Sequence, residues 1–177
     1  MAQVQIDVLL TEDQLRTRTR ELAADIRATL ADEPLVLIGV LKGCVPFIGD
    51  LARELSGDVA IDYVQVSSYG DGKTSTGVFQ LKKDHDINIE GRHVVVVEDI
   101  VDSGLTLARL RELLATRRPA SLTAVAMLSK PDARSHESRV EHVGFEIPNV
   151  FVVGYGLDHA ESYRNLPFVG VLRESHG

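Results

Sequence analysis

The sequence predicts an α/β fold with a central, mostly parallel sheet flanked by helices. Short apolar runs alternate along the 177-residue chain with segments of helical periodicity. The run at residues 94–97 contains only valine, which is typical of a strand buried on both faces of a parallel sheet. With 44% hydrophobic residues, the chain has enough apolar side chains for one core. We therefore expect a single domain over residues 1–177.

The expected elements follow in order from the N-terminus. A helix should begin after Thr11, which opens a capping box, and should run to about Leu30. A buried strand ends at residue 41, and Pro46 lies in the first turn of the next helix, which ends near residue 55. Further along, the pattern predicts strands at residues 60–69, 94–97, 122–128 and 149–154, a mobile loop at residues 70–77, and a helix at residues 105–116.

Composition argues against several classes of protein. The N-terminal residues lack a basic segment before an apolar stretch, and no apolar run reaches 18 residues, so we expect neither secretion nor a membrane span. The single cysteine, Cys44, rules out an internal disulfide and indicates a reducing, cytoplasmic location. A net charge of −7 disfavours nucleic acid as a partner, because nucleic-acid binding needs a basic face.

The most informative segment is a strand that leads into two carboxylates. Glu98 and Asp99 follow the valine run, at the strand end where open α/β sheets bind ligands. Residues 103–106 then supply hydroxyls, a glycine and the start of a helix, which together can surround a phosphate. Adjacent carboxylates suit sugar hydroxyls or a hydrated Mg²⁺. The same pattern also fits a strand with solvated acids and a serine cap.

Three other segments combine turn-forming or apolar residues with possible ligand-binding side chains. A turn with Lys42 and Gly43 follows the first strand, and a loop rich in Gly, Ser and Thr follows Ser68 and Tyr69. In the C-terminal third, Lys130 precedes a proline, and an apolar run reads NVFVVGYGLD. Each also has a plain structural interpretation. The first would be a turn and the second a flexible loop, while the C-terminal residues would be an exposed lysine and a core strand.

Together these segments resemble the type I phosphoribosyltransferases. The stretch HVVVVEDIVDSGLTL is similar to their signature for phosphoribosyl diphosphate (PRPP), which has a hydrophobic strand, two acids, two apolar or small residues, and a loop of the form Asp/Thr-Ser/Thr-Gly-x-Thr. With Asp102 before Ser-Gly, it resembles the hypoxanthine-guanine branch most. The resemblance spans residues 35–172. It implies a core at about residues 35–130 and a small hood subdomain from the N-terminal and C-terminal segments.

The resemblance implies a reaction in purine salvage. The enzyme would transfer the 5-phosphoribosyl group from PRPP to N9 of a 6-oxopurine base, hypoxanthine or guanine, and would release pyrophosphate with the help of Mg²⁺. On the PRPP side, the resemblance assigns the ribose hydroxyls and the metal to Glu98 and Asp99, with Asp158 as a further metal ligand. It assigns the 5-phosphate to the loop Ser103, Gly104, Leu105 and Thr106. Pyrophosphate would be bound by Lys42, Gly43 and Arg164.

On the purine side, the resemblance makes Asp102 the catalytic residue, because it would accept the N7 proton or a hydrogen bond from it. Lys130 would donate to the 6-oxygen, Phe151 would stack on the ring, and the Val152 backbone would read its edge. Ser68 and Tyr69 would lead a lid that excludes water from the reaction centre. Family members often hold the bond before the residue at the Lys42 position in the cis form, and the sequence leaves this geometry open.

The chain departs from the family pattern at few positions. His159 and Ala160 follow Asp158 where many relatives have a tyrosine and another residue, and Cys44 lies where relatives often have Ser, Ala or Gly. The preference among hypoxanthine, guanine and xanthine stays open, and so does the choice between a homodimer and a homotetramer. Adenine should be a poor substrate, since Lys130 would face an amino group.

Two alternatives remain. A relative of the same fold, resembling the pyrimidine-operon attenuation regulator, would bind RNA. It typically carries two aspartates before an apolar-Tyr/Phe-Thr-Gly-Arg-Thr loop and a basic face, whereas this chain has Glu98-Asp99, Lys130 and an acidic net charge. A receiver-type signalling domain also has acids at a strand end. Its phosphoacceptor aspartate would not precede a Ser-Gly-x-Thr loop.

Overall fold

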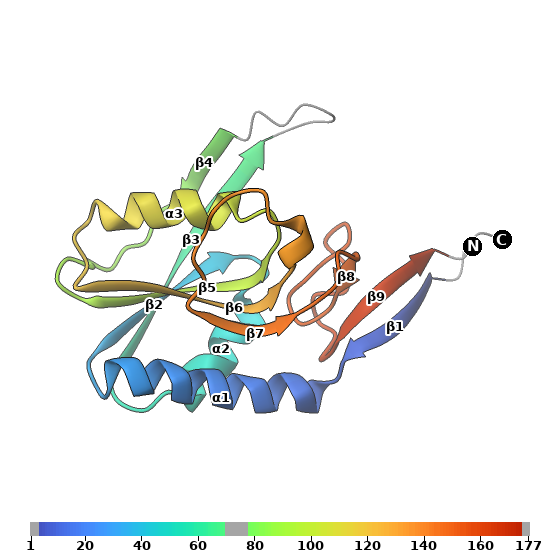
Figure 1. Cartoon of the computed structure of the whole chain (residues 1–177), viewed down its shortest axis with the longest axis horizontal. Coiled ribbons are helices and arrows are strands. Elements are labelled where there is room, and N and C mark those ends of the chain that lie inside the picture. Colours follow the sequence, from blue (N-terminus) through green and yellow to red (C-terminus); the bar gives the residue numbers. More distant parts are fainter. Residues whose placement is uncertain (1–3, 70–77, 175–177) are drawn as a thin grey trace.

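The computed structural model describes residues 4–69 and 78–174, and a six-stranded sheet forms its centre (Figure 1). The strands run in the order β4-β3-β2-β5-β6-β7, and all are parallel except β4, which pairs antiparallel with β3. Their bounds are β2 (Leu35–Leu41), β3 (Val59–Tyr69), β4 (Val78–Lys83), β5 (His93–Val101), β6 (Ser121–Ser129) and β7 (His142–Glu146). The predicted fold class, a mostly parallel sheet flanked by helices, is confirmed.

The strand order creates a switch point between β2 and β5. From β2 the chain continues to β3 on one side, whereas from β5 it continues to β6 and β7 on the other side. Because consecutive connections leave in opposite directions, a crevice opens at the carboxyl ends of these two strands. Ligands bind at this position in open α/β sheets.

Helices cover both faces of the sheet. On one face lie α1 (Glu12–Leu30) and α2 (Val45–Glu54), and on the other lies α3 (Leu105–Ala115) (Figure 1). The capping box at Thr11 is confirmed: its Oγ1 accepts a hydrogen bond from the Gln14 N–H at 3.2 Å, and Gln14 Oε1 accepts one from the Thr11 N–H at 2.9 Å. The predicted helices at residues 45–55 and 105–116 are also confirmed to within a residue at each end.

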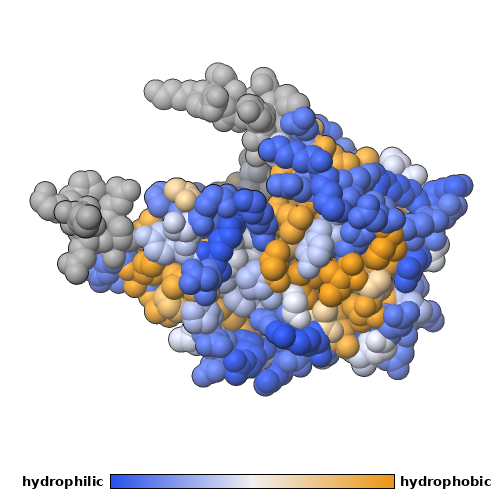
Figure 2. Space-filling model, turned by 180° about the vertical axis from the view of Figure 1, so that it is seen from behind, coloured by the Kyte–Doolittle hydropathy of each residue, from blue (hydrophilic) through white to orange (hydrophobic). Residues whose placement is uncertain are grey.

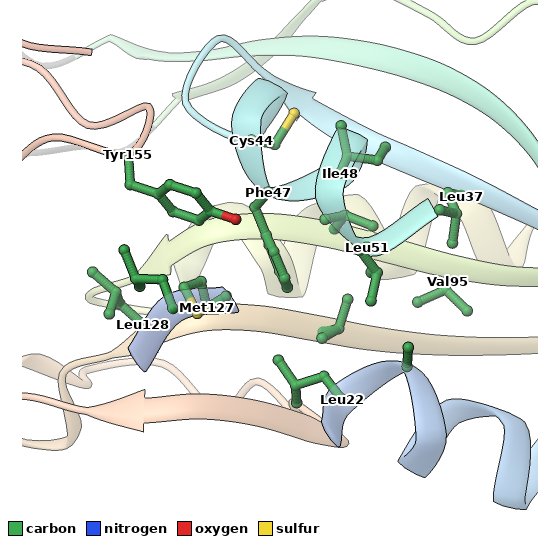
Figure 3. Packing of buried hydrophobic residues seen from close by; sticks show 14 of the residues in the cluster. Leu22, Leu37, Cys44, Phe47, Ile48, Leu51, Val95, Met127, Leu128 and Tyr155 are labelled. Carbon is green, nitrogen blue, oxygen red and sulfur yellow. The ribbon is translucent and has the colours of Figure 1, made fainter. Parts of the chain in front are cut away.

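The two faces of β5 pack into different hydrophobic clusters. Val95 and Val97 belong to the cluster beneath α1 and α2, whereas Val94 and Val96 belong to the cluster beneath α3. This alternation is the two-residue period of a strand that is covered on both sides. Figure 3 shows part of the first cluster, with residues contributed by α1, α2 and the sheet: Leu22, Phe47, Leu51 and Met127.

A second, three-stranded antiparallel sheet lies at one end of the large sheet (Figure 1). Its strand order is β1-β9-β8, with bounds β1 (Val4–Leu10), β9 (Val169–Glu174) and β8 (Val152–Val153). It joins the two terminal segments of the chain, because Val4 pairs with Glu174 and Leu10 with Val169. The sequence did not predict β1 or β9, and it did not predict β4 or β7 of the large sheet.

The predicted strand at residues 149–154 is wrong in extent, because only Val152 and Val153 are extended and paired. Before them, the Val150 N–H donates to the Pro148 carbonyl in a tight turn. After them, Gly154, Tyr155 and Gly156 all have positive φ, which ends the strand. The predicted loop at residues 70–77 lies outside the described residues. No helix in the described part of the chain is both long and apolar enough to cross a membrane.

The edge strand β7 is capped by a side chain from α1. The guanidinium of Arg18 donates to two carbonyls of β7, from Nε to Gly144 at 3.0 Å and from Nη2 to Val143 at 2.9 Å. An uncovered strand edge carries unpaired carbonyls that can recruit another chain. Arg18 satisfies two of these carbonyls and ties α1 to the sheet.

We expect Arg18→Ala to lower the free energy of unfolding by about 1–2 kcal/mol, because it removes two charge-assisted hydrogen bonds from partly buried carbonyls. Arg16→Ala is the matched control on the same helix. Arg16 makes only an exposed i,i+4 pair with Glu12, so its loss should change stability by less than about 0.5 kcal/mol. Urea unfolding of both variants measures the difference, and equal effects would contradict the capping role.

Candidate active site

The predicted site residues gather around the carboxyl ends of β2 and β5. The strand β5 is longer than predicted, since it pairs with β6 as far as Val101, although its pairing with β2 stops at Val97. Glu98 and Asp99 therefore lie inside β5 and not at its end. They still lie at the crevice, because beyond Val97 the β2 side of the strand has no ladder partner among the described residues.

Three segments of the chain meet at Gly43, where a side chain would overlap the Asp99 carboxyl group. A Cβ at Gly156, which has a φ of 98°, would overlap the Gly43 carbonyl. These two glycines let the turn after β2 pack directly between β5 and the segment at residues 154–157. The bond between Leu41 and Lys42 in this turn is cis, which the sequence had left open.

The two neighbouring acids on β5 have different surroundings, since Glu98 is buried and Asp99 is half-buried. Glu98 is 6% exposed and lines a cavity beside the following loop, whereas Asp99 lies against Gly43. Burial raises the pKa of Glu98 well above its ordinary value, and the negative charge of Asp99 raises it further. Burial also raises the pKa of Asp99 to about 6, although hydrogen bonds such as that from the Ile100 N–H counteract the shift. These carboxyl groups are suited to polar or cationic ligands that restore their lost hydration.

The loop after β5 forms a small cavity at the start of α3. The cavity has a volume of about 160 Å³ and is lined by residues from Glu98 through the first turn of α3, including Asp102, Ser103, Gly104 and Thr106. Gly104 is the N-cap residue with a φ of 84°, and as a glycine it offers no side chain to cap the helix. Leu105 begins the helix, and its N–H donates to Ser103 Oγ at 3.3 Å. Backbone amides at a helix N-terminus together with two hydroxyls are suited to a phosphate.

A segment that received no role from the sequence supports this loop. The N–H groups of Ser135 and His136 both donate to the Ser103 carbonyl, at 3.1 and 3.0 Å. A Cβ at Gly104 would overlap Ser138, Arg134 and the His136 carbonyl, so the segment packs closely on the glycine. Only the fold brings it against the phosphate loop.

Asp102 and Lys130 form an ion pair beside the phosphate loop. The Lys130 Nζ lies 3.1 Å from Asp102 Oδ1, and the Lys130 N–H donates to the Val101 carbonyl at 3.0 Å. Lys130 is only 7% exposed, so the plain interpretation as a surface lysine is wrong. The Asp102 side chain is 54% exposed, which leaves its carboxylate accessible to a ligand. The pair therefore presents a donor and an acceptor side by side.

Phe151 and Val152 differ sharply in environment. Val152 is 5% exposed and pairs with Val171, as expected of a core strand residue. Phe151 is 54% exposed, which is unusual for an aromatic side chain, and its ring contacts His159 edge-on at 5.6 Å between centroids. An exposed ring offers a face on which a flat ligand can stack.

Two cations near Gly43, Lys42 and Arg164, are both paired with acids. The Lys42 Nζ donates to Glu161 Oε2 at 2.9 Å. Arg164 Nη2 lies 2.9 Å from Asp158 Oδ1 and 3.4 Å from Glu161 Oε1, while its Nη1 donates to the Gly156 carbonyl at 2.7 Å. The sequence predicted three of these four charged residues. It did not predict Glu161, which carries no motif signal.

The predicted metal ligands are not assembled into one cluster. Glu98 and Asp99 are neighbours on a strand, so their side chains leave in opposite directions, and Asp158 is paired with Arg164. Within residues 4–69 and 78–174, no three His, Cys, Asp or Glu side chains are arranged to hold an ion. Separate carboxylates nevertheless fit Mg²⁺, which proteins commonly bind through one or two carboxylates plus substrate phosphates.

The proposed lid residues lie at the edge of what the structure describes. Ser68 and Tyr69 end β3 and pair with Phe79 and Val78 of β4, at the ends of these two strands that extend past their neighbours (Figure 1). The lid role also involves residues 70–77 and lies outside the described residues.

Cys44 is the N-cap residue of α2 and is fully buried. Figure 3 shows its sulfur within the cluster formed by α2 and the sheet. Burial raises the pKa of its thiol strongly, and the charges of Asp99 and Glu98 add to the shift. Cys44 therefore packs as a small apolar residue, because a thiol that stays protonated is a poor nucleophile.

A larger cavity of about 560 Å³ lies between α1, α2 and the segment at residues 155–167. Of the predicted site residues, Arg164 is the one that lines it. Its other charged residues form carboxylate pairs of their own, such as Arg20 with Glu54 and Arg53 with Asp50. Apart from Arg164, it shares no residue with the predicted site.

Comparison with known proteins accounts for this arrangement. A family model described as a phosphoribosyl transferase domain matches residues 6–160. The chain belongs to the phosphoribosyltransferase family. It is 44% identical over 166 residues to a hypoxanthine-guanine phosphoribosyltransferase of Bacillus subtilis, which covers 94% of this chain and 92% of that protein. It is 45% identical to an enzyme of the same name from Streptococcus agalactiae. That match extends over 167 residues and covers 94% of this chain and 93% of that protein.

A crystal structure of a hypoxanthine-guanine phosphoribosyltransferase from Bacillus anthracis has the same fold. It matches with a TM-score of 0.90 at 43% identity, over 97% of this chain and all of that one. The predicted resemblance to the hypoxanthine-guanine branch is thereby confirmed. This phosphoribosyltransferase is an enzyme, and its relatives indicate phosphoribosyl transfer in purine salvage.

We expect Gly43→Ala to lower the transferase activity by about 10²-fold, because the new methyl group must displace the Asp99 carboxyl group from its position in the site. Gly49→Ala in α2 is the matched control, since a Cβ there meets no neighbouring atom. It should leave activity unchanged and raise stability by about 0.5–1 kcal/mol, because alanine favours a helix interior over glycine. Steady-state kinetics and urea unfolding test both, and an active Gly43→Ala enzyme would contradict the close packing.

Proposed function

We propose that the enzyme transfers the phosphoribosyl group of PRPP to N9 of hypoxanthine or guanine, giving IMP or GMP and pyrophosphate, with Mg²⁺. The observation that carries this proposal is the Asp102–Lys130 pair, which lies directly beside the phosphate loop. The names of the relatives from Bacillus subtilis and Streptococcus agalactiae support the choice of bases.

The pair is complementary to one edge of a 6-oxopurine. On that edge the 6-oxygen and N7 are adjacent, and the free base can carry a proton on N7. The Lys130 ammonium can donate to the 6-oxygen while the Asp102 carboxylate accepts from N7–H. Adenine presents an amino group at position 6, which would leave the buried lysine without an acceptor. The exposed ring of Phe151 is suited to stacking on the base.

The remaining residues suit PRPP. The cavity at residues 103–106 would take the 5-phosphate, and the carboxylates of Glu98 and Asp99 would orient the ribose hydroxyls. Lys42, Arg164 and the amide of Gly43 would bind the pyrophosphate. Mg²⁺ would be held by Asp99, Glu98 or Asp158 together with oxygens of the substrate, and it would supply positive charge beside the departing pyrophosphate.

The reaction follows from these positions. N9 forms a bond to the anomeric carbon as the bond from that carbon to pyrophosphate breaks, and negative charge accumulates on the leaving group. Lys42 and Arg164 stabilise this charge, while Asp102 stabilises the positive charge that develops on the purine and accepts the N7 proton. Holding base and sugar in line contributes further by removing their freedom of motion.

Self-association and cytoplasmic location stay predictions from the sequence. The face of the molecule in Figure 2 carries a band of hydrophobic residues bordered by hydrophilic ones, which supports contact with a second copy. Four large hydrophobic side chains are notably exposed on the described residues: Val8, Val45, Ile61 and Phe151. Light scattering coupled to size-exclusion chromatography would distinguish a monomer, a homodimer and a homotetramer.

The activity is tested by pyrophosphate release from PRPP and Mg²⁺, with hypoxanthine, guanine, xanthine, adenine and uracil supplied separately. Turnover with hypoxanthine or guanine and little with adenine or uracil is the expected result. Turnover with uracil alone would contradict the roles of Lys130 and Phe151. A lack of pyrophosphate release with every base would contradict the proposed function as a whole.

Asp102→Asn should lower kcat by about 10²–10⁴-fold, because an amide accepts a proton far less well than a carboxylate. The KM for PRPP should change little, since Asp102 faces the base. Asp132→Asn removes an equal charge from an exposed position nearby and should have no effect. Steady-state kinetics decide the matter, and an unchanged kcat in Asp102→Asn would remove the catalytic role.

Lys130→Ala should raise the KM for hypoxanthine by about tenfold or more, because it removes a charged donor to the 6-oxygen. Lys82→Ala is the control, since Lys82 is exposed on β4. The relative rate with adenine should rise in Lys130→Ala, because the selective donor is gone. An unaffected KM for hypoxanthine would mean that the ring binds elsewhere.

A further inference from the structure

A single carboxylate contacts both cations of the proposed pyrophosphate site. Glu161 accepts a hydrogen bond from Lys42 through Oε2 at 2.9 Å, and its Oε1 lies 3.4 Å from Arg164 Nη2. The adjacent Lys42 lowers the pKa of Glu161, so it is ionised at neutral pH. An anion therefore already occupies the position between the two cations where a second anion is expected to bind.

The backbone around Glu161 is shaped to present it there. His159 and Ser162 form a pair of hydrogen bonds at 3.1 and 3.0 Å, which closes a turn with Ala160 and Glu161 at its tip. Both tip residues have positive φ, 49° and 64°, although such turns normally use Gly or Asn at these positions. The Glu161 N–H also donates to Asp158 Oδ2 at 2.9 Å. A backbone conformation that costs free energy and persists at a binding site indicates a functional constraint.

A ligand can easily replace Glu161 in its ion pairs with Lys42 and Arg164. The side chains of Lys42 and Glu161 are 55% and 65% exposed, and ion pairs of such exposure contribute little free energy. A multiply charged diphosphate can therefore replace the carboxylate, whereas a weakly charged anion gains less from doing so. Arg164 keeps its bonds to Asp158 and the Gly156 carbonyl, so it stays in place when Glu161 moves.

We infer that Glu161 is an internal competitor for the pyrophosphate site: its carboxylate pairs with Lys42 and Arg164 in the empty enzyme, and PRPP or pyrophosphate must displace it. This role rests on the proposed function of these two cations. It has two consequences. Glu161 weakens the binding of pyrophosphate, and on product release it returns to the cations and promotes dissociation.

The test is calorimetric titration of inorganic pyrophosphate with Mg²⁺ into the enzyme, without base or PRPP. Glu161→Gln should bind pyrophosphate about three- to tenfold more tightly than the wild type, since it removes competition from two exposed ion pairs. Glu161→Gly should do the same, and glycine fits the positive φ without strain. Glu112→Gln is the matched control, because it removes an equal charge from an exposed pair on α3.

The outcomes separate this inference from the proposed function. If the wild type binds pyrophosphate but both Glu161 variants bind it equally well or more weakly, internal competition is overturned and the proposed function stands. If the wild type does not bind pyrophosphate, both ideas fail. A Lys42→Gln background adds a second check: the gain from Glu161→Gln should become smaller there, because one of the two contested cations is absent. An undiminished gain would also overturn the inference.

Discussion

The close approach of three segments of the chain at Gly43 is the constraint on which the rest of the site depends. The turn after β2 lies against the Asp99 carboxyl group on one side and against Gly156 on the other. Each contact exists because a glycine leaves room for it. Through this junction, the position of Lys42 is coupled to the acids of β5, and both are coupled to the segment that carries Asp158 and Arg164. The junction lies at the switch point of the sheet, where the strand order itself opens a crevice.

The acids and the cations around this junction have different surroundings. The acids of β5 have lost much of their hydration, which raises the pKa of both carboxyl groups. The cations, by contrast, are matched with carboxylates: Lys130 with Asp102, Lys42 with Glu161, and Arg164 with Asp158. A substrate that carries phosphates, hydroxyls and a polar base edge can exchange these internal contacts for its own. Carboxylates of the protein thus already pair with the cations that the ligand would contact.

Much of the fold could be predicted from the sequence because its elements carry strong local signals. The valine run of β5, the capping box at Thr11 and Pro46 at the start of α2 each reflect local chemistry. The pairing of β1 with β9 could not be predicted, since these strands are of ordinary composition and lie at opposite ends of the chain, as for Val4 with Glu174.

The candidate site likewise combines residues that carry a local sequence signal with residues that only the fold brings together. The residues of the PRPP-like signature and the cations were found from motifs, whereas the burial of Lys130 and its contact with Asp102 needed the fold. Glu161 gave no signal, because it is an exposed acid in a turn whose tip is not Gly or Asn. Segments such as residues 134–138 were also missed, since their role is to hydrogen-bond a carbonyl that any sequence possesses.

The central claim is that Asp102 and Lys130 together bind the edge of a 6-oxopurine beside the phosphate loop. A crystal structure of the enzyme with IMP tests it most directly. The account predicts the 6-oxygen within hydrogen-bonding distance of Lys130 Nζ, N7 facing the Asp102 carboxylate, and the 5-phosphate in the cavity at residues 103–106. A nucleotide bound with its 6-oxygen away from Lys130, or with its phosphate outside that cavity, would contradict it.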